Sequence, residues 1–310
     1  MKTKAIENKF KNVNLKYIHI GVIIIGIIFI SLSIFHTNQW FDEAYSIGMV
    51  THSVKDIWRI GSTDVHPVLY YLLLHIIELI FGKNIIMFRV FSVVCMAILG
   101  ILGFTHIRKD FGEKVGLLFT TLVYFLPVNL IYAGEIRMYS LAMLLVTLMA
   151  IYAYRICKNV DSPNLKNWIL FAIFSLSSAY THYYALMTAG IINIYLLIYL
   201  ISKSVKEKKF NKNLIGFIIS GLLQVFLYSP WIICLLSQVK EVSKGFWINL
   251  KFPDTIIQFF VFQFVGNLEN TKYVTELFGG IFGLIIILSV IHLAFSKKGK
   301  WTVQRKRPKI

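Results

Sequence analysis

The sequence predicts an all-α protein that crosses a membrane several times. It has 310 residues, of which 57% are hydrophobic and 15% are charged, and its mean hydropathy is +0.68. Soluble domains are about one quarter charged. The apolar residues also fall in runs close to the roughly 20 residues that a helix needs to cross a bilayer. These observations exclude a soluble globular domain.

We predict about eight transmembrane helices, placed on the longest apolar runs. The runs are Tyr17–Phe35, Ile85–Thr105, Val115–Ala133, Met138–Cys157, Trp168–Thr181, Ala185–Ile201, Leu214–Leu235 and Leu277–Phe295. Ser31 and Ser33 give the first run a weak cleavage pattern, but its length and the spans that follow favour an uncleaved helix. Two shorter runs, Pro67–Phe81 and Ile256–Val265, are predicted as juxtamembrane or re-entrant helices on the outer face.

The distribution of charge predicts the orientation of these spans. If neither short run crosses the bilayer, the segments on one side hold 23 of the 32 Lys and Arg residues and 5 of the 15 acidic residues. Cytoplasmic loops carry such an excess of basic residues. We therefore expect a multi-pass protein of the cell membrane, with both termini cytoplasmic and the active site extracytoplasmic. The same loops account for the net charge of +17, so no nucleic-acid partner is predicted.

Four regions follow from this topology. They are a basic cytoplasmic N-terminus at 1–16, a catalytic membrane module at 17–201 with a first external loop at 36–84, C-terminal membrane helices at 202–296 with an external loop at 236–276, and a basic cytoplasmic tail at 297–310. The three cysteines are far apart and predict neither a metal site nor a disulfide. Because the sequence contains no glycine-rich phosphate loop, we expect no cofactor and no use of cytoplasmic ATP.

An acidic pair, Asp42 and Glu43, follows the first span and is framed by Trp40, Phe41 and Tyr45. Trp and Tyr concentrate at the level of the lipid headgroups, which predicts an acidic site at the membrane edge. Neighbouring residues diverge by about 100° on a helix. One carboxylate is therefore expected to face the site, while the other supports it or is solvated. The alternative is a solvated pair that only marks the end of a helix.

Two further segments of this half of the chain carry candidate residues. His66 precedes Pro67, which is predicted as the first residue of a helix, so the histidine would lie at an end that favours anions. Arg89 lies inside a span, where a charge either reaches the interface or has a partner. The structural alternatives are a capped helix end for His66 and a snorkelling side chain for Arg89.

The segment Gly134–Tyr139 joins two predicted spans almost without a loop. It holds Glu135, Arg137 and Tyr139 at the membrane edge, and an arginine there can bind a phosphate through two parallel hydrogen bonds. The alternative is that Glu135 and Arg137 form an ion pair in which the two charges neutralise each other and contact no substrate. His182 lies in another outer turn among tyrosines and is a weaker candidate for substrate contact.

These motifs together resemble the GT-C membrane glycosyltransferases, in particular the group of protein mannosyltransferases, aminoarabinose transferases and rhizobial lipopolysaccharide transferases. The resemblance covers about residues 17–200 and rests on the acidic pair, the His-Pro-x-x-Tyr-Tyr segment, the Phe-Arg pair and the Glu-x-Arg-x-Tyr turn. It implies a GT-C fold and an inverting glycosyltransferase. Such an enzyme moves a sugar from a polyprenyl-phosphate carrier in the membrane to a hydroxyl of a glycan, lipid or protein acceptor on the outer face.

The resemblance also implies roles by position. Asp42 corresponds to the general base, with Glu43 beside it in the catalytic pair, and His66 corresponds to the residue that contacts the carrier phosphate. The other candidate ligands of the substrate or phosphate are Arg89, Glu135, Arg137, Tyr139 and His182. Cations stabilise the departing phosphate, so this mechanism requires no metal.

Two departures from the family pattern leave the acceptor open. Val68 stands where the family often has a second proline, and no large outer domain is predicted. A lipid-linked oligosaccharide or lipid transporter and a non-catalytic membrane scaffold are the rival hypotheses. A transporter is expected to carry charges near the bilayer midplane, whereas the charges here lie at the outer edge. Their position favours the enzyme.

Overall fold

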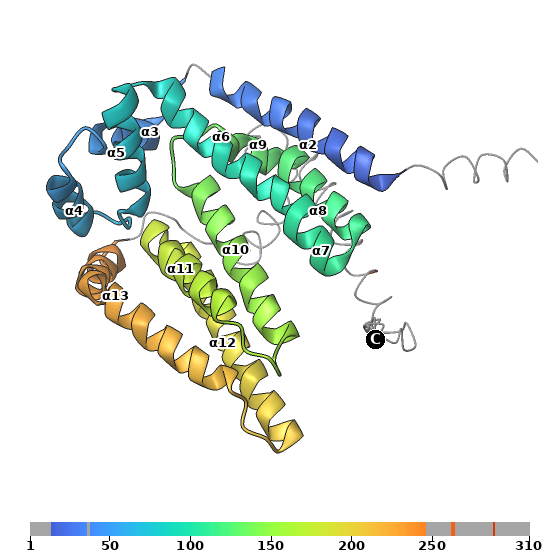
Figure 1. Ribbon diagram of the computed structural model, residues 1–310. Helices are drawn as coiled ribbons and strands as arrows, with labels where there is room; N and C mark the ends of the chain where they lie inside the picture. The colour runs from blue at the N-terminus through green and yellow to red at the C-terminus, as the bar shows by residue number, and fades with distance from the viewer. Residues whose placement is uncertain (1–13, 36–37, 246–261, 264–287, 289–310) are drawn as a thin grey trace, which may run out of the picture. The chain divides into compact units, whose positions relative to one another are not determined.

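The computed structural model describes residues 14–35, 38–245, 262–263 and 288. The chain divides into two compact units, Met1–Ile248 and Asn249–Ile310, and every helix named below belongs to the first. All regular elements in the described residues are helical, as the sequence predicted (Figure 1). The predicted span at 277–295 and the short run at 256–265 lie outside the described residues, apart from 262–263 and 288.

Five helical segments in the described residues are long and apolar enough to cross a membrane, or six if a bent pair counts as one span, so the chain is a polytopic α-helical membrane protein. They are α2 (Leu15–Ser31) with η1 (Leu32–Phe35), α6 (Ile85–Leu102) continued by η2 (Gly103–Ile107) and α7 (Arg108–Phe111), α10 (Tyr139–Lys158), α12 (Tyr183–Glu207) and α13 (Asn213–Ser243). A further apolar helix, α11 (Leu165–Thr181), has 17 residues.

Two of the predicted spans differ from the structure. The stretch predicted as one span at Val115–Ala133 consists of α8 (Glu113–Phe125) and α9 (Pro127–Ala133), which are bent by 61°. Pro127 starts α9, where a missing N–H costs little, and it forces the preceding residue out of the helical region. The last described span, α13, continues past the predicted end to Ser243, so the stretch predicted as a loop at 236–276 begins in a helix.

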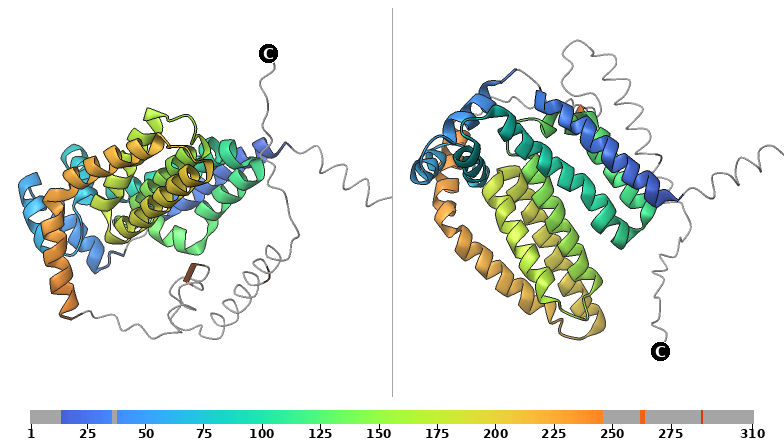
Figure 2. Two further views of the ribbon diagram at one scale, coloured as in Figure 1. Left: turned by 90° about the horizontal axis from the view of Figure 1, so that it is seen from below. Right: turned by 45° about the horizontal axis from the view of Figure 1, so that its top comes forward.

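The long helices pack through close contacts between small and large residues. α2, α6 and α8 pack together, and α10 connects them to α11, which packs against α12 and α13 (Figure 2). The ring of Tyr124 fills the space left by two glycines, because a Cβ on Gly26 or Gly100 would lie 2.2 or 2.1 Å from it. The Tyr124 hydroxyl also donates a hydrogen bond of 2.7 Å to the Ala97 carbonyl, which joins α8 to α6.

Three short helices gather at one end of the long ones. They are α3 (Phe41–Met49), α4 (Val54–Thr63) and α5 (Leu69–Phe81), and Figures 1 and 2 show them together at the same end. The side-chain amide of Gln238 on α13 donates to the carbonyls of Gly61 and Ser62 at 2.9 and 3.2 Å, which holds α4 in place. The predicted start of a helix at Pro67 is wrong, because the first hydrogen bond of α5 runs from Leu72 N–H to the Val68 carbonyl.

Ion pairs join the long helices at their opposite end. Asp110 accepts from Arg155 at 2.9 Å and from Lys158 at 3.2 Å, and His19 lies 3.4 Å from Glu113. The segments that the charge distribution assigned to one side, 106–114 and 155–167, therefore meet at one end of the bundle. The acidic pair of α3 lies at the other end.

Candidate active site

The two adjacent carboxylates of α3 face different partners. Asp42 and Glu43 lie in the first turn of the helix, where the helix dipole favours negative charge. Asp42 Oδ2 is 3.4 Å from Arg137 NH2, and Glu43 Oε2 is 3.6 Å from Arg89 NH2. The Asp42 side chain is 34% exposed, whereas that of Glu43 is only 3% exposed. The divergence expected for neighbouring helical residues thus separates one accessible carboxylate from one buried carboxylate.

The buried carboxylate, Glu43, connects three segments of the chain. Its Oε1 accepts a hydrogen bond of 3.0 Å from the Ile136 N–H, and its Oε2 pairs with Arg89 on α6. Arg89 in turn donates a bond of 3.0 Å to the Asn38 carbonyl ahead of α3. Arg89 is therefore not a snorkelling charge, because it pairs with Glu43 and its side chain is 1% exposed.

Arg137 lies at the centre of the site, and its side chain is 2% exposed. Its NH1 group donates to the Asp42 carbonyl at 3.3 Å, to Ser46 Oγ at 3.3 Å and to the Tyr71 hydroxyl at 3.5 Å. Its NH2 group lies 3.2 Å from His66 Nε2. Its Nε is buried and has no hydrogen-bond partner among the described residues. Four residues from three segments therefore orient one guanidinium group, and one of its donors has no partner among the described residues.

His66 contacts Arg137 as a neutral imidazole. A guanidinium group only donates hydrogen bonds, so the Nε2 atom that faces it carries a lone pair and the proton resides on Nδ1. Nδ1 lies 3.4 Å from Asp64 Oδ2 and donates to it. Burial raises the pKa of Asp64, but hydrogen bonds from His66 and the Val65 N–H outweigh it, so the pKa is lowered overall. His66 precedes the N-cap residue Val68 and is not at the first turn of α5, where the sequence placed it.

His182 is a second neutral histidine in the site. It is the N-cap of α12, and its Nδ1 accepts a hydrogen bond of 3.1 Å from the Tyr184 N–H. Its ring centroid lies 5.7 Å from that of Tyr139 and 6.0 Å from that of His66. Burial, together with the nearby charge of Arg137, lowers the pKa of His182 to about 4. The proton of the neutral ring is therefore on Nε2.

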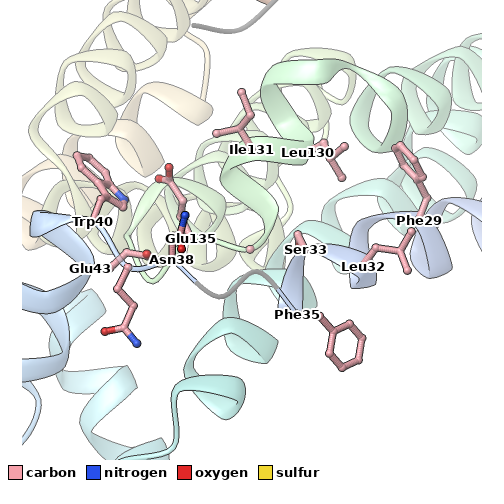
Figure 3. A pocket seen from close by; sticks show the side chains of 12 residues that line it. Phe29, Leu32, Ser33, Phe35, Asn38, Trp40, Glu43, Leu130, Ile131 and Glu135 are labelled. Atoms are coloured by element: carbon pink, nitrogen blue, oxygen red, sulfur yellow. The ribbon is translucent and has the colours of Figure 1, made fainter.

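Glu135 lies in the turn between α9 and α10, on the same side of α3 as Glu43. Ser92 Oγ holds the backbone of the turn by donating 2.6 Å to the Glu135 carbonyl. The Oε2 atom of the side chain is buried and has no partner among the described residues. Burial, together with the nearby charge of Glu43, raises the pKa of Glu135 to about 7. Both carboxylates line a cavity of about 580 Å³ beside η1 (Figure 3).

The structure thus brings together all eight candidate residues and adds four that were not among the candidates. The added residues are Ser46 and Tyr71, which hold Arg137, and Tyr45 and Asp64, which interact with each other. Ser46 lies one turn after Asp42, so helical spacing predicts that both face the same way. No spacing rule predicts the contact with Arg137. In the described part of the chain, no cluster of three or more His, Cys, Asp or Glu side chains is arranged to hold a metal ion.

Comparison with known proteins gives one match. A family model described as dolichyl-phosphate-mannose-protein mannosyltransferase matches residues 65–234 of the 310. The match covers more than half of the chain and contains six of the eight candidate residues, but it begins after Asp42 and Glu43. No curated protein and no solved structure matches the chain.

Proposed function

Because the chain belongs to the dolichyl-phosphate-mannose-protein mannosyltransferase family, and is therefore a membrane glycosyltransferase, we propose that it moves a sugar from a polyprenyl-phosphate carrier to an acceptor hydroxyl. The observation that carries this proposal is the contact between Asp42 and Arg137. A candidate base and a candidate phosphate ligand, 95 residues apart in the chain, lie 3.4 Å from each other. Sugar transfer from a phosphate carrier needs both groups at one place.

Asp42 is the proposed general base. It is the exposed member of the acidic pair, whereas both oxygens of Glu43 are engaged by Arg89 and by the Ile136 N–H. A base must lie within hydrogen-bonding reach of the proton it removes. Glu43 is a positioning residue in this proposal, because it fixes the first turn of α3 against the turn that carries Arg137.

Arg137 is the proposed ligand of the carrier phosphate. Arginine binds phosphates through parallel N–H donors, and the buried Nε of Arg137 is one donor without a partner in the described residues. The neutral His182, whose ring centroid lies 5.7 Å from that of Tyr139, supplies an Nε2 proton nearby. His66 accepts from Arg137, so its proposed role is to orient the guanidinium rather than to neutralise the phosphate.

The proposed reaction is a single displacement with inversion. The acceptor hydroxyl gives its proton to the Asp42 carboxylate while its oxygen bonds to the anomeric carbon of the sugar. The bond between that carbon and the phosphate oxygen breaks, and the electron pair leaves with the phosphate. Arg137 stabilises this developing charge, which is where a preorganised donor lowers the barrier. The Lys and Arg distribution supports an extracytoplasmic position for the site.

The test replaces Asp42 by Asn, which keeps the shape of the side chain and removes the base. Loss of a general base typically lowers the rate by about 10²–10⁴-fold. Mass spectrometry of cell-surface glycans identifies the product by comparing cells with and without the protein. Cells that carry Asp42→Asn should lack the product, while Asp56→Asn, at an exposed carboxylate of α4, should retain it. Normal product formation by Asp42→Asn would contradict the assignment of the base.

A second variant tests the phosphate ligand. Arg137→Lys keeps a positive charge but loses the planar fork of donors. We expect weaker binding of polyprenyl phosphate to the purified variant, by about tenfold or more, because one or more charge-assisted hydrogen bonds are lost. Unchanged binding would remove Arg137 from this role.

A further inference from the structure

The cavity beside η1 has one apolar and one polar side. Its volume of about 580 Å³ is in the range of small-molecule sites, roughly 300–1,000 Å³. Phe29 and Leu32 of the first span and Ile131 of α9 line one side, whereas Glu43 and Glu135 line the other. Figure 3 shows Glu43 and Glu135 at one end of the cavity and Phe29 and Leu32 at the other, with Ile131 between them. A ligand that matches both sides has an apolar chain and a polar head.

The apolar side of the cavity is continuous with surface that faces lipid. Leu32, Phe35 and Ile131 are 61%, 72% and 44% exposed in the described structure. They belong to a membrane-spanning segment and to the bent pair α8–α9. In a bilayer, such exposed apolar side chains contact acyl chains rather than water. The apolar chain of a ligand can therefore enter the cavity sideways from the membrane.

The polar side of the cavity disfavours a ligand whose head carries a negative charge. Both oxygens of Glu43 already have partners, but Glu135 Oε2 is buried and has none among the described residues. A buried oxygen of this kind costs about 1–3 kcal/mol unless a donor reaches it. A hydroxyl group can hydrogen-bond to it, whereas a phosphate would meet the negative charge of Glu43 and no Lys, Arg or His among the residues that line the cavity. Arg137 pairs with Asp42, the carboxylate that diverges from the cavity.

We propose that this cavity binds the acceptor, and that the acceptor is a membrane amphiphile whose head bears hydroxyl groups and no negative charge. The inference rests on the proposed transferase function and names the substrate class of the same site. The donor phosphate then lies on the Arg137 side of the first turn of α3 and the acceptor head on the Glu135 side, so that the reacting ends of the two substrates meet at Asp42. Glu135 holds one acceptor hydroxyl while another reaches Asp42. A peptide acceptor has no long apolar chain to fill the apolar side of the cavity.

The first experiment measures binding with defined amphiphiles. A photoreactive dodecyl maltoside, added to the purified full-length protein in lipid nanodiscs, should crosslink to residues of the cavity. Ile131→Trp fills the cavity and should weaken this labelling at least tenfold. Ile194→Trp places the same side chain on an exposed apolar position of α12 and should leave labelling unchanged. At pH 8, where Glu135 with its pKa of about 7 is ionised, dodecyl phosphate should fail to compete in the unmodified protein, and Glu135→Gln should let it compete, because one negative charge is removed.

The second experiment identifies the acceptor class in cells. The sugar product should appear in the lipid extract rather than on precipitated protein, and Ile131→Trp should reduce it while leaving polyprenyl phosphate binding intact. Product on protein, labelling that survives Ile131→Trp, or equal competition by dodecyl phosphate would overturn the inference. None of these outcomes contradicts the proposed transferase function, which fails instead if cells with and without the protein make the same surface glycans.

Discussion

Glu43 and Arg89 form a buried ion pair across α3 and α6, with 3.6 Å between Oε2 and NH2 and with side chains 3% and 1% exposed. The pair joins the loop before α3 to the turn after α9, because Arg89 also binds the Asn38 carbonyl and Glu43 also binds the Ile136 N–H. The position of Asp42, one residue away, depends on this pair.

Removing one partner of this pair should destabilise the protein strongly. Glu43→Gln leaves the Arg89 guanidinium buried without a counter-charge, and such a change costs about 3–5 kcal/mol. Thermal unfolding of the purified variant in detergent should show a clearly lowered midpoint. Asp56→Asn breaks the exposed pair of Asp56 with Arg59 and should leave the midpoint almost unchanged, because solvent screens an exposed ion pair. Equal effects of the two variants would show that the buried pair has no special role.

The pKa of Glu135 predicts a loss of stability as the pH rises. Burial raises this pKa from 4.5 to about 7, so the folded protein holds a proton that the unfolded chain releases. The contribution of Glu135 is therefore fully present below about pH 4.5 and is lost as the pH rises through about 7. At about 1.4 kcal/mol per pKa unit, the loss is on the order of 3 kcal/mol.

Glu135→Gln isolates this effect. Denaturation of the variant between pH 4.5 and 8 should show less loss of stability than the unmodified protein, since Gln does not titrate. Glu241→Gln changes an exposed carboxylate on α13 and should keep the full dependence. A Glu135→Gln curve that parallels the original would refute the raised pKa.

Gly134 should tolerate no larger residue. A Cβ at this position would lie 2.6 Å from Ser33 Oγ and 2.7 Å from the Ser33 backbone oxygen, and the backbone cannot move aside cheaply. Gly134→Ala should therefore cost about 1–3 kcal/mol in the free energy of unfolding. Gly190→Ala is the matched control, because a Cβ there meets nothing within 4 Å. Alanine in that helix should be neutral or stabilising, by up to about 1 kcal/mol.

The orientation of the bundle can be tested with single cysteines in a variant that lacks the three native ones. A membrane-impermeant maleimide should label Thr51→Cys, near the end of α3, in intact cells. It should label Glu207→Cys, at the end of α12, only after the cells are permeabilised. The reverse pattern would place the site in the cytoplasm.

The apolar runs predicted where most helices lie, because a helix that crosses a bilayer is recognised by its length and its apolar composition alone. They did not predict the break at Pro127, since the apolar pattern continues on both sides of it. The motifs predicted which residues gather at the site. The pairing of Asp42 with Arg137 and of Glu43 with Arg89 could not be predicted, because it depends on contacts between segments distant in the sequence. Nor could the sequence show that His66 faces a guanidinium as an acceptor, which requires knowledge of the ring orientation.

The consecutive positions of Asp42 and Glu43 also limit how homologous chains can diverge in length. Each carboxylate pairs with an arginine from a different segment, so the rotation of α3 is fixed by two independent contacts. A single inserted residue between Trp40 and Asp42 would turn both side chains by about 100° and break both pairs together. Insertions and deletions in this family should therefore avoid the first turn of α3, and grafting this acidic pair onto another membrane scaffold would require transferring both arginines with it.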